Sequence, residues 1–168
     1  MKHRLRFVLL LILMGLLISA CDSSNKEADK VKNEGFAIYL LAEDIPAQQV
    51  FKTNLDELQL RTEPLISVDD IIAYHKETQE LELIDGAMIH LYARSHGQPF
   101  VVCVGLDRIY CGVFWDGLKS TLWAPIMIDL PLSPESRSTR IWALTSEGNE
   151  LISDPRILES LEQAGKLK

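Results

Sequence analysis

An apolar run over residues 7–18, followed by a polar stretch over 22–34, leaves only the later part of this chain able to form a folded domain. It follows a basic start at residues 2–6 and is about a dozen residues long, which suits the apolar region of a secretory signal and is short for a membrane span. Residues 22–34 contain almost no apolar side chain, so they cannot bury enough surface to become ordered. A folded domain is therefore expected in residues 35–168.

Small residues and a cysteine end the signal segment. The sequence Ile18-Ser19-Ala20-Cys21 resembles the lipobox of bacterial lipoproteins. This resemblance implies cleavage after Ala20 and a diacylglycerol thioether on Cys21, which becomes the mature N-terminus. Two or three acyl chains would hold the protein at a membrane, because each buried methylene adds roughly 0.8 kcal/mol. An ordinary signal peptide with a chance cysteine and an uncleaved signal anchor are the alternatives.

The residue after the cysteine bears on location. Asp22 resembles the inner-membrane retention signal of lipoproteins in two-membrane bacteria, and a single-membrane host offers only one membrane. Both cases predict a lipid-anchored protein on the extracytoplasmic face of the cell membrane. The expected organisation is a signal peptide over 1–20, a lipidated cysteine with a flexible tether over 21–34, and the domain over 35–168.

The charge of the mature chain is acidic. Residues 1–20 hold three of the 17 basic residues and none of the 24 acidic ones, so the remainder carries 14 basic and 24 acidic residues, a net charge of −10. Nucleic-acid binding requires basic patches, and anionic lipid head groups repel an acidic body. We therefore expect no nucleic-acid partner, and membrane contact through the lipid alone.

Hydrophobic periodicity and turn residues predict the elements of the domain. Strands are predicted over 36–41, 78–84, 99–104, 109–115, 125–130 and 139–145, and helices over 46–58, 68–75 and 86–94. The strands 99–104 and 109–115 form a hairpin, and 125–130 lies nearer an edge because prolines flank it. A turn is predicted over 147–150. A last helix has Asp154 as its N-cap, Pro155 at its first position and Gly165 at its end.

This order predicts an α+β fold. It is a single small domain with a mixed, mostly antiparallel sheet and three to four helices that cover one side of the sheet. Cys103 and Cys111 lie on the two hairpin strands. A cross-strand disulfide is geometrically demanding, so both a disulfide and a pair of buried free thiols remain open, with free thiols favoured.

Motifs for catalysis or metal binding do not stand out. His75, His90 and His96 lack the spacing of a zinc site, and neither hairpin cysteine has a neighbouring histidine. The sequence contains no nucleophile elbow and no glycine-rich phosphate loop. We therefore predict no catalytic residue, no metal and no cofactor.

A cluster of aromatic and charged residues around the hairpin is the least ordinary local feature. It consists of Arg108, Tyr110, Trp115, Asp116 and Trp123. Tyrosine and tryptophan are common in binding hot spots and also at the edges of cores. These five residues are a candidate interaction surface, with ordinary packing as the alternative.

Several segments of the domain resemble a family of small uncharacterised bacterial lipoproteins. They are Phe36-Ala37-Ile38-Tyr39-Leu40 with Asp44-Ile45, Pro64-Leu65-Ile66-Ser67 with Asp70-Ile71 and Tyr74, Pro99-Phe100-Val101-Val102-Cys103-Val104, Arg108-Ile109-Tyr110 with Gly112 and Phe114-Trp115, and Asp154-Pro155-Arg156-Ile157. The resemblance implies no catalytic residue. A looser likeness, carried by Ile66-Ser67 with Asp70-Ile71 ahead of the strand 99–104, is to the small extracytoplasmic α+β domain of SecD-type translocase subunits. It implies protein handling.

The sequence as a whole predicts a membrane-anchored, non-enzymatic accessory module that binds a protein or another envelope component. A lipid-anchored hydrolase or redox enzyme with a scattered site is one alternative, and it requires a cleft with ionisable groups of perturbed pKa. A small-ligand sensor is another, and it requires a pocket between the helices and the sheet.

Overall fold

The computed structural model describes residues 35–94, 96–118, 124–133 and 135–168, which belong to one compact unit. The signal segment 1–20, Cys21, the tether over 22–34 and Trp123 lie outside the described residues. Within the described ranges, no helix combines the length and the hydropathy that a membrane span requires.

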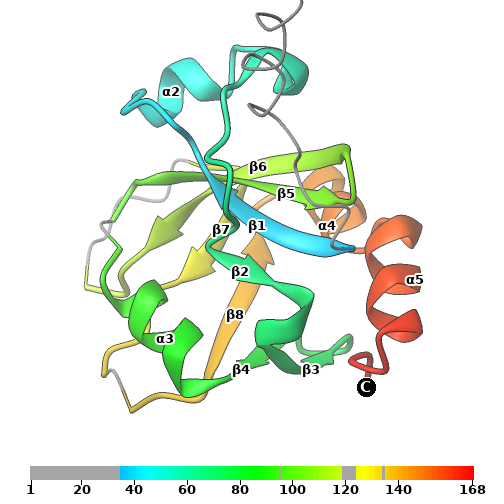
Figure 1. Ribbon diagram of the computed structural model, residues 1–168. Coiled ribbons are helices and arrows are strands. Elements are labelled where there is room, and N and C mark those ends of the chain that lie inside the picture. Colours follow the sequence, from blue (N-terminus) through cyan, green and yellow to red (C-terminus); the bar gives the residue numbers. More distant parts are fainter. Residues whose placement is uncertain (1–34, 95, 119–123, 134) are drawn as a thin grey trace, which may run out of the picture. The chain divides into compact units, whose positions relative to one another are not determined.

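One sheet dominates the described domain (Figure 1). Its strands are β1 (Phe36–Leu40), β2 (Ile66–Ser67), β3 (Ile71–His75), β4 (Glu80–Leu83), β5 (Pro99–Val104), β6 (Asp107–Trp115), β7 (Ile126–Asp129) and β8 (Ser138–Ala143). They lie in the order β2-β1-β5-β6-β7-β8-β4-β3, and every neighbouring pair is antiparallel except β6 and β7. The predicted α+β class and mostly antiparallel sheet are confirmed.

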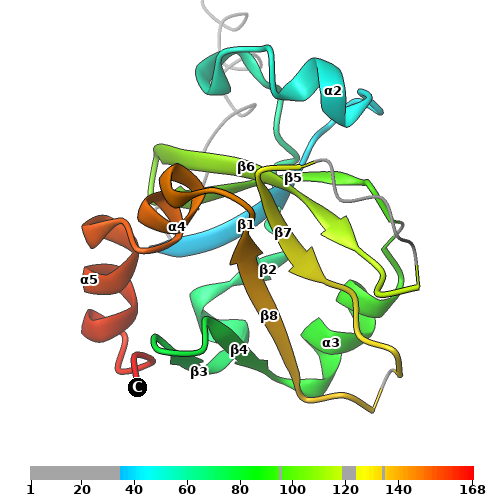
Figure 2. The same cartoon turned by 180° about the vertical axis from the view of Figure 1, so that it is seen from behind.

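The sheet curls until it nearly closes into a barrel (Figures 1 and 2). Its two outermost strands, β2 and β3, are joined in the chain by the short 3-10 helix η2 (Val68–Asp70). The outer side of β3 pairs with the chain end, because the Tyr74 N–H donates to the Lys166 carbonyl and the Lys168 N–H donates to the Tyr74 carbonyl, at 2.7 and 2.9 Å. The main core therefore lies inside the curled sheet together with helical residues such as Met88 and Leu161, instead of on one helix-covered side of the sheet as predicted.

Two apolar layers bury the first strand completely. Phe36, Ile38 and Leu40 point into the main core, which also contains Phe100 and Phe114. The alternate residues of β1 face a second cluster outside the barrel, formed with the following segment 41–60. All five residues of β1 are buried for this reason.

The segment 41–60 is less helical than predicted. Its helices are α2 (Ala47–Val50) and the 3-10 helix η1 (Leu55–Glu57), in place of one helix over 46–58. The Thr53 hydroxyl donates to the Gln49 carbonyl, and the Asn54 side chain accepts from the Asp56 N–H. Such side-chain bonds compete with continuous helix and favour a fresh start at Asn54.

The prediction of a helix over 68–75 is wrong. Ser67 and Asp70 form a capping box, in which the Ser67 N–H donates to Asp70 Oδ2 at 2.8 Å, but only one 3-10 turn follows. From Ile71 the chain is the strand β3, paired with β4. The β-branched Ile71 and Ile72 suit a strand, and pairing with β4 outweighs the local helix signal.

Two further expectations need correction. The turn over 147–150 is the helix α4 (Ser146–Ile152), which the Thr145 side chain caps by accepting from the Gly148 N–H at 3.1 Å. The strand over 125–130 is β7, and it lies between β6 and β8 instead of near an edge. Pro125 and Pro131 flank its paired residues, so they remove no hydrogen bond from the ladder.

The remaining predicted elements are confirmed. The helix predicted over 86–94 is α3 (Asp85–Tyr92), whose ends differ by one or two residues from the predicted ones. The strands β4, β5, β6 and β8 begin and end within a few residues of the predicted positions. The last helix, α5 (Pro155–Gln163), begins with the expected cap, since Asp154 Oδ1 accepts from the Arg156 N–H at 2.9 Å. Gly165 follows it with a positive φ of 70°, as a helix-ending glycine should.

Candidate functional site

Four of the five predicted surface residues are described, and the structure does not place these four on one surface. Arg108 lies near the start of β6 and donates from Nη1 to the Leu55 and Leu58 carbonyls, the latter at 2.7 Å. Arg108 therefore fastens η1 to the outside of the barrel. Tyr110 is only 2% exposed and belongs to the main core, so it offers no surface to a partner.

Trp115 and Asp116 lie at the far end of the same strand. Trp115 is half-buried and packs edge-on against Trp142, with ring centroids 5.4 Å apart. The Asp116 N–H donates to His96 Nδ1 at 3.3 Å. Trp123 lies outside the described residues. Arg108 and Trp115 are thus separated by most of the length of β6.

The two hairpin cysteines are free thiols. Cys103 pairs with Arg108 in the ladder, whereas Cys111 pairs with Val101, so the cysteines are not opposite each other. Burial raises the pKa of the Cys103 thiol to about 11 and also raises that of Cys111. Both thiols stay protonated at neutral pH, which makes them poor nucleophiles.

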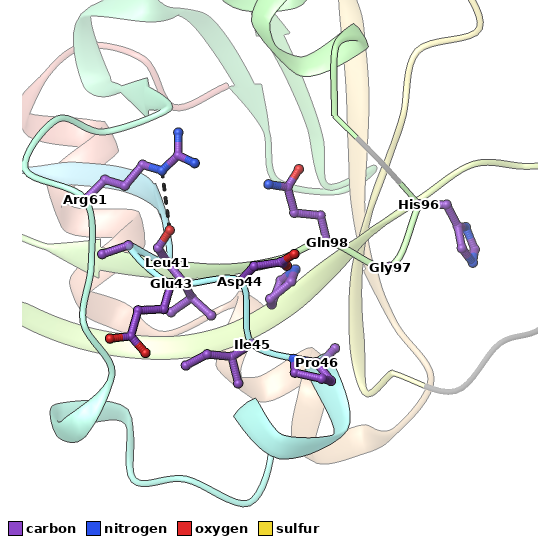
Figure 3. A pocket seen from close by; sticks show the side chains of 12 residues that line it. Leu41, Glu43, Asp44, Ile45, Pro46, Arg61, His96, Gly97 and Gln98 are labelled. Atoms are coloured by element: carbon purple, nitrogen blue, oxygen red, sulfur yellow. Dashed lines mark hydrogen bonds between the residues drawn. The ribbon is translucent and has the colours of Figure 1, made fainter.

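Two adjoining hollows form the most promising site, and together we call them the Arg61 groove. The first encloses about 530 Å³ and the second about 500 Å³. They share Ala42 and Arg61. The first is lined by residues 41–47, Arg61 and residues 96–99 (Figure 3), and the second by Leu40, Ala42, residues 61–65, His90 and Arg94.

The fold places Arg61 at the centre of this groove. Leu41 forms an antiparallel bridge with Leu60, and the Arg61 N–H donates to the Leu40 carbonyl at 2.9 Å. The chain after η1 is therefore held beside the end of β1. The opposite wall of the second hollow comes from α3, whose buried side chains Ala87, Met88 and Leu91 fix it on the core.

Both arginines of the second hollow are oriented by main-chain carbonyls. Arg61 Nε donates to the Leu41 carbonyl at 3.4 Å, the dashed line in Figure 3, and Arg94 Nε donates to the His90 carbonyl at 3.0 Å. Among the described residues, neither guanidinium forms an ion pair with a carboxylate. The outer nitrogens of each fork are therefore available to an anionic group.

The first hollow has the opposite charge. Glu43 and Asp44 are exposed on the connection between β1 and α2, and Figure 3 shows both beside Ile45 and Pro46. Across the shared Arg61 the groove therefore changes from an acidic half to a basic half. Glu63 also lines the basic half, so its two arginines are only partly balanced.

A third hollow, on the outer face of β7, β8 and β4, contains the carboxylates of Asp129 and Glu80. Burial raises the pKa of Asp129, although the Trp142 Nε1–H donates to its Oδ1 at 2.6 Å. Glu80 accepts from the Ser138 hydroxyl. Within the described part of the chain, no group of three or more His, Cys, Asp or Glu side chains could hold a metal ion.

Comparisons with protein-family models, with curated proteins and with solved structures found no match. The assignment of a site therefore rests on geometry. No sequence signal points to the Arg61 groove, because Arg61 and Arg94 lie far apart in the chain and neither belongs to a motif. The pairing of β1 with β5 and the bridge between Leu41 and Leu60 bring the two arginines to one hollow.

Proposed function

We propose that this protein is a lipid-anchored, non-enzymatic accessory module. It stands on the extracytoplasmic face of the cell membrane and binds a protein or another envelope component in the Arg61 groove. The observation that carries the binding role is the pair of oriented guanidinium groups, Arg61 and Arg94, in one concave site without a carboxylate partner among the described residues. Two like charges that line one hollow favour an anionic ligand, which would offset their repulsion.

The sequence supports the anchor. The apolar run over 7–18, the small residues before Cys21 and the polar tether 22–34 occur in the order that a lipoprotein requires. A tether of this composition gives the domain an r.m.s. reach of about 20 Å from the lipid. The non-enzymatic assignment is supported by the raised pKa of Cys103 and Cys111, which disfavours thiolate chemistry.

The anchor is tested by cell fractionation of Cys21→Ser in the native host. The wild-type protein is expected in the membrane fraction, resistant to salt and alkali washes, and the variant is expected in the soluble extracytoplasmic fraction or as uncleaved precursor. Recovery of a processed variant in the washed membranes, at the wild-type level, contradicts the proposed anchor.

The binding role is tested by photocrosslinking in living cells. A photoreactive residue at Thr62, which lines the basic half of the groove, should yield a discrete adduct. The matched control carries the same residue at Leu144, which is 46% exposed and lines neither hollow. No adduct at Thr62, or the same adducts at both positions, contradicts binding in the groove.

A small-ligand sensor is the second candidate, and the size of the first hollow favours it. Its volume of about 530 Å³ lies within the range of about 300–1,000 Å³ that is common for small-molecule sites. A sensor would gain thermal stability from a metabolite extract freed of proteins, whereas a protein-binding module would not.

A further inference from the structure

The charges along the Arg61 groove indicate what kind of partner it fits. The basic half presents the forks of Arg61 and Arg94, and the acidic half presents Glu43 and Asp44. An arginine fork binds a carboxylate through two parallel N–H···O bonds, so it selects for that group in a way that a lysine does not. A ligand that follows the whole groove must therefore carry a carboxylate at one end and tolerate or satisfy carboxylates at the other.

The helix α3, which supplies one wall of the basic half, also carries exposed apolar side chains outside the hollow. Ile89 and Tyr92 of α3 are 53% and 48% exposed, and they lie in the same helix as His90, which lines the groove. A helix with apolar residues on its outer face as well as its buried face offers area to the side chains of a bound polypeptide.

We propose that the Arg61 groove binds an extended segment of a partner protein in which acidic residues are followed by basic ones. A carboxylate of that segment lies between Arg61 and Arg94, and a basic side chain further along lies near Glu43 and Asp44. This inference rests on the proposed function, since it names the partner chemistry of the same site. A membrane surface fits less well, because Glu43, Asp44 and Glu63 line the groove and the mature chain is acidic, so anionic head groups are repelled.

The test measures peptide binding by fluorescence anisotropy, with the full chain purified in detergent micelles. The probe is a labelled, end-capped peptide with two glutamates followed by two lysines between serine spacers. A second peptide replaces the glutamates with glutamines. The wild-type chain should bind the first peptide at least tenfold more tightly than the second, and added salt should reduce the difference.

Variants locate the binding. Arg61→Gln and Arg94→Gln should each weaken binding of the glutamate-containing peptide by about ten- to hundredfold, which is the usual effect of losing a charge-assisted hydrogen bond. Arg61→Lys keeps the charge but loses the fork, so it should fall between Arg61→Gln and wild type. The exposed Arg137 lines neither hollow, and Arg137→Gln, with the same change in net charge, should leave binding within about twofold.

Several results overturn the inference: equal affinity for both peptides, equal losses in Arg61→Gln and Arg137→Gln, or tighter binding to phosphatidylglycerol vesicles than to the glutamate-containing peptide. Circular dichroism and urea unfolding of each variant separate lost binding from lost structure. If Thr62 crosslinks a partner in cells while the peptides bind equally, the proposed function stands and the acidic preference fails. If Thr62 gives no adduct, the proposed function itself fails.

Discussion

A methyl group added at Gly112 tests how tightly β5, β6 and β7 pack. A Cβ built at this position lies 2.5 Å from Phe100 Cζ and 2.8 Å from the Ile126 carbonyl oxygen. Contacts between carbon atoms are normally about 3.5–4.0 Å, so the overlap is about 1 Å. Phe100 is fully buried and packs on Phe114 at 5.0 Å, and the second obstacle is backbone, so neither neighbour moves freely.

We expect Gly112→Ala to lower the free energy of unfolding by about 3 kcal/mol, the upper part of the range for overpacked cores. With a urea m-value of about 2 kcal/mol/M for a domain of this size, the unfolding midpoint falls by about 1.5 M. Circular dichroism in a urea titration measures this shift.

Gly86 provides the matched control, because the chemical change is the same and the surroundings differ. Nothing lies within 4 Å of a Cβ at Gly86, which is in the first turn of α3. Gly86→Ala should raise stability by about 0.5 kcal/mol through helix propensity. Equal midpoints for Gly112→Ala and wild type, or equal shifts in the two variants, would refute the packing described for β6.

Three further predictions concern single side chains. Arg108→Met removes the two hydrogen bonds to η1 and should destabilise the chain by about 2–3 kcal/mol, with hydrogen exchange rising first in the segment 41–60; uniform exchange across the domain would contradict that role. Cys103 should react with iodoacetamide about 100-fold more slowly in the native than in the urea-unfolded chain at pH 8, because its pKa is about 11 against an ordinary 9; native reactivity within a few fold of unfolded would contradict its burial. Asp154→Ala removes the cap of α5 and should cost about 1 kcal/mol at pH 7, measured by urea unfolding. The hydrogen bond from Arg156 lowers the pKa of Asp154, so its stabilisation is present above the ordinary carboxyl pKa and is lost as the pH falls through the lowered value; a difference between variant and wild type that does not shrink as the pH falls below the ordinary carboxyl pKa would contradict this.

The sequence pattern predicted those helices and strands whose local residue preferences match their burial in the folded domain. The strand at 99–104 is buried on both faces and is apolar throughout. The strand at 139–145 is buried on one face, so apolar and polar residues alternate along it. Both patterns are distinct enough to be recognised in the sequence. The helix α5 was found because Asp154, Pro155 and Gly165 each have one natural place at a helix end.

The predictions were wrong where one local sequence motif is compatible with two different structures. The capping box at Ser67 is satisfied by a single 3-10 turn, and whether a helix continues depends on β4, which is later in the chain. Pro125 and Pro131 indicated an edge strand, but they lie just outside the paired residues of β7. Single-sequence patterns do not contain this information, because it comes from strand pairing.

The candidate site was less predictable than the fold. Tyr110 and Trp115 were notable as residue types, yet one is buried in the core and the other packs on Trp142. Arg61 and Arg94 were unremarkable in sequence and acquire significance only through the hollow that they share.

Mass spectrometry of the mature protein, isolated from its native host, tests the central claim most directly. A tethered binding module requires an N-terminal Cys21 that carries a diacylglycerol thioether, with or without a third acyl chain on its amino group. That mass, with residues 1–20 absent, is the predicted result. An intact signal segment, or a processed chain without acyl groups, would contradict the proposed anchor and the location of the Arg61 groove at the membrane surface.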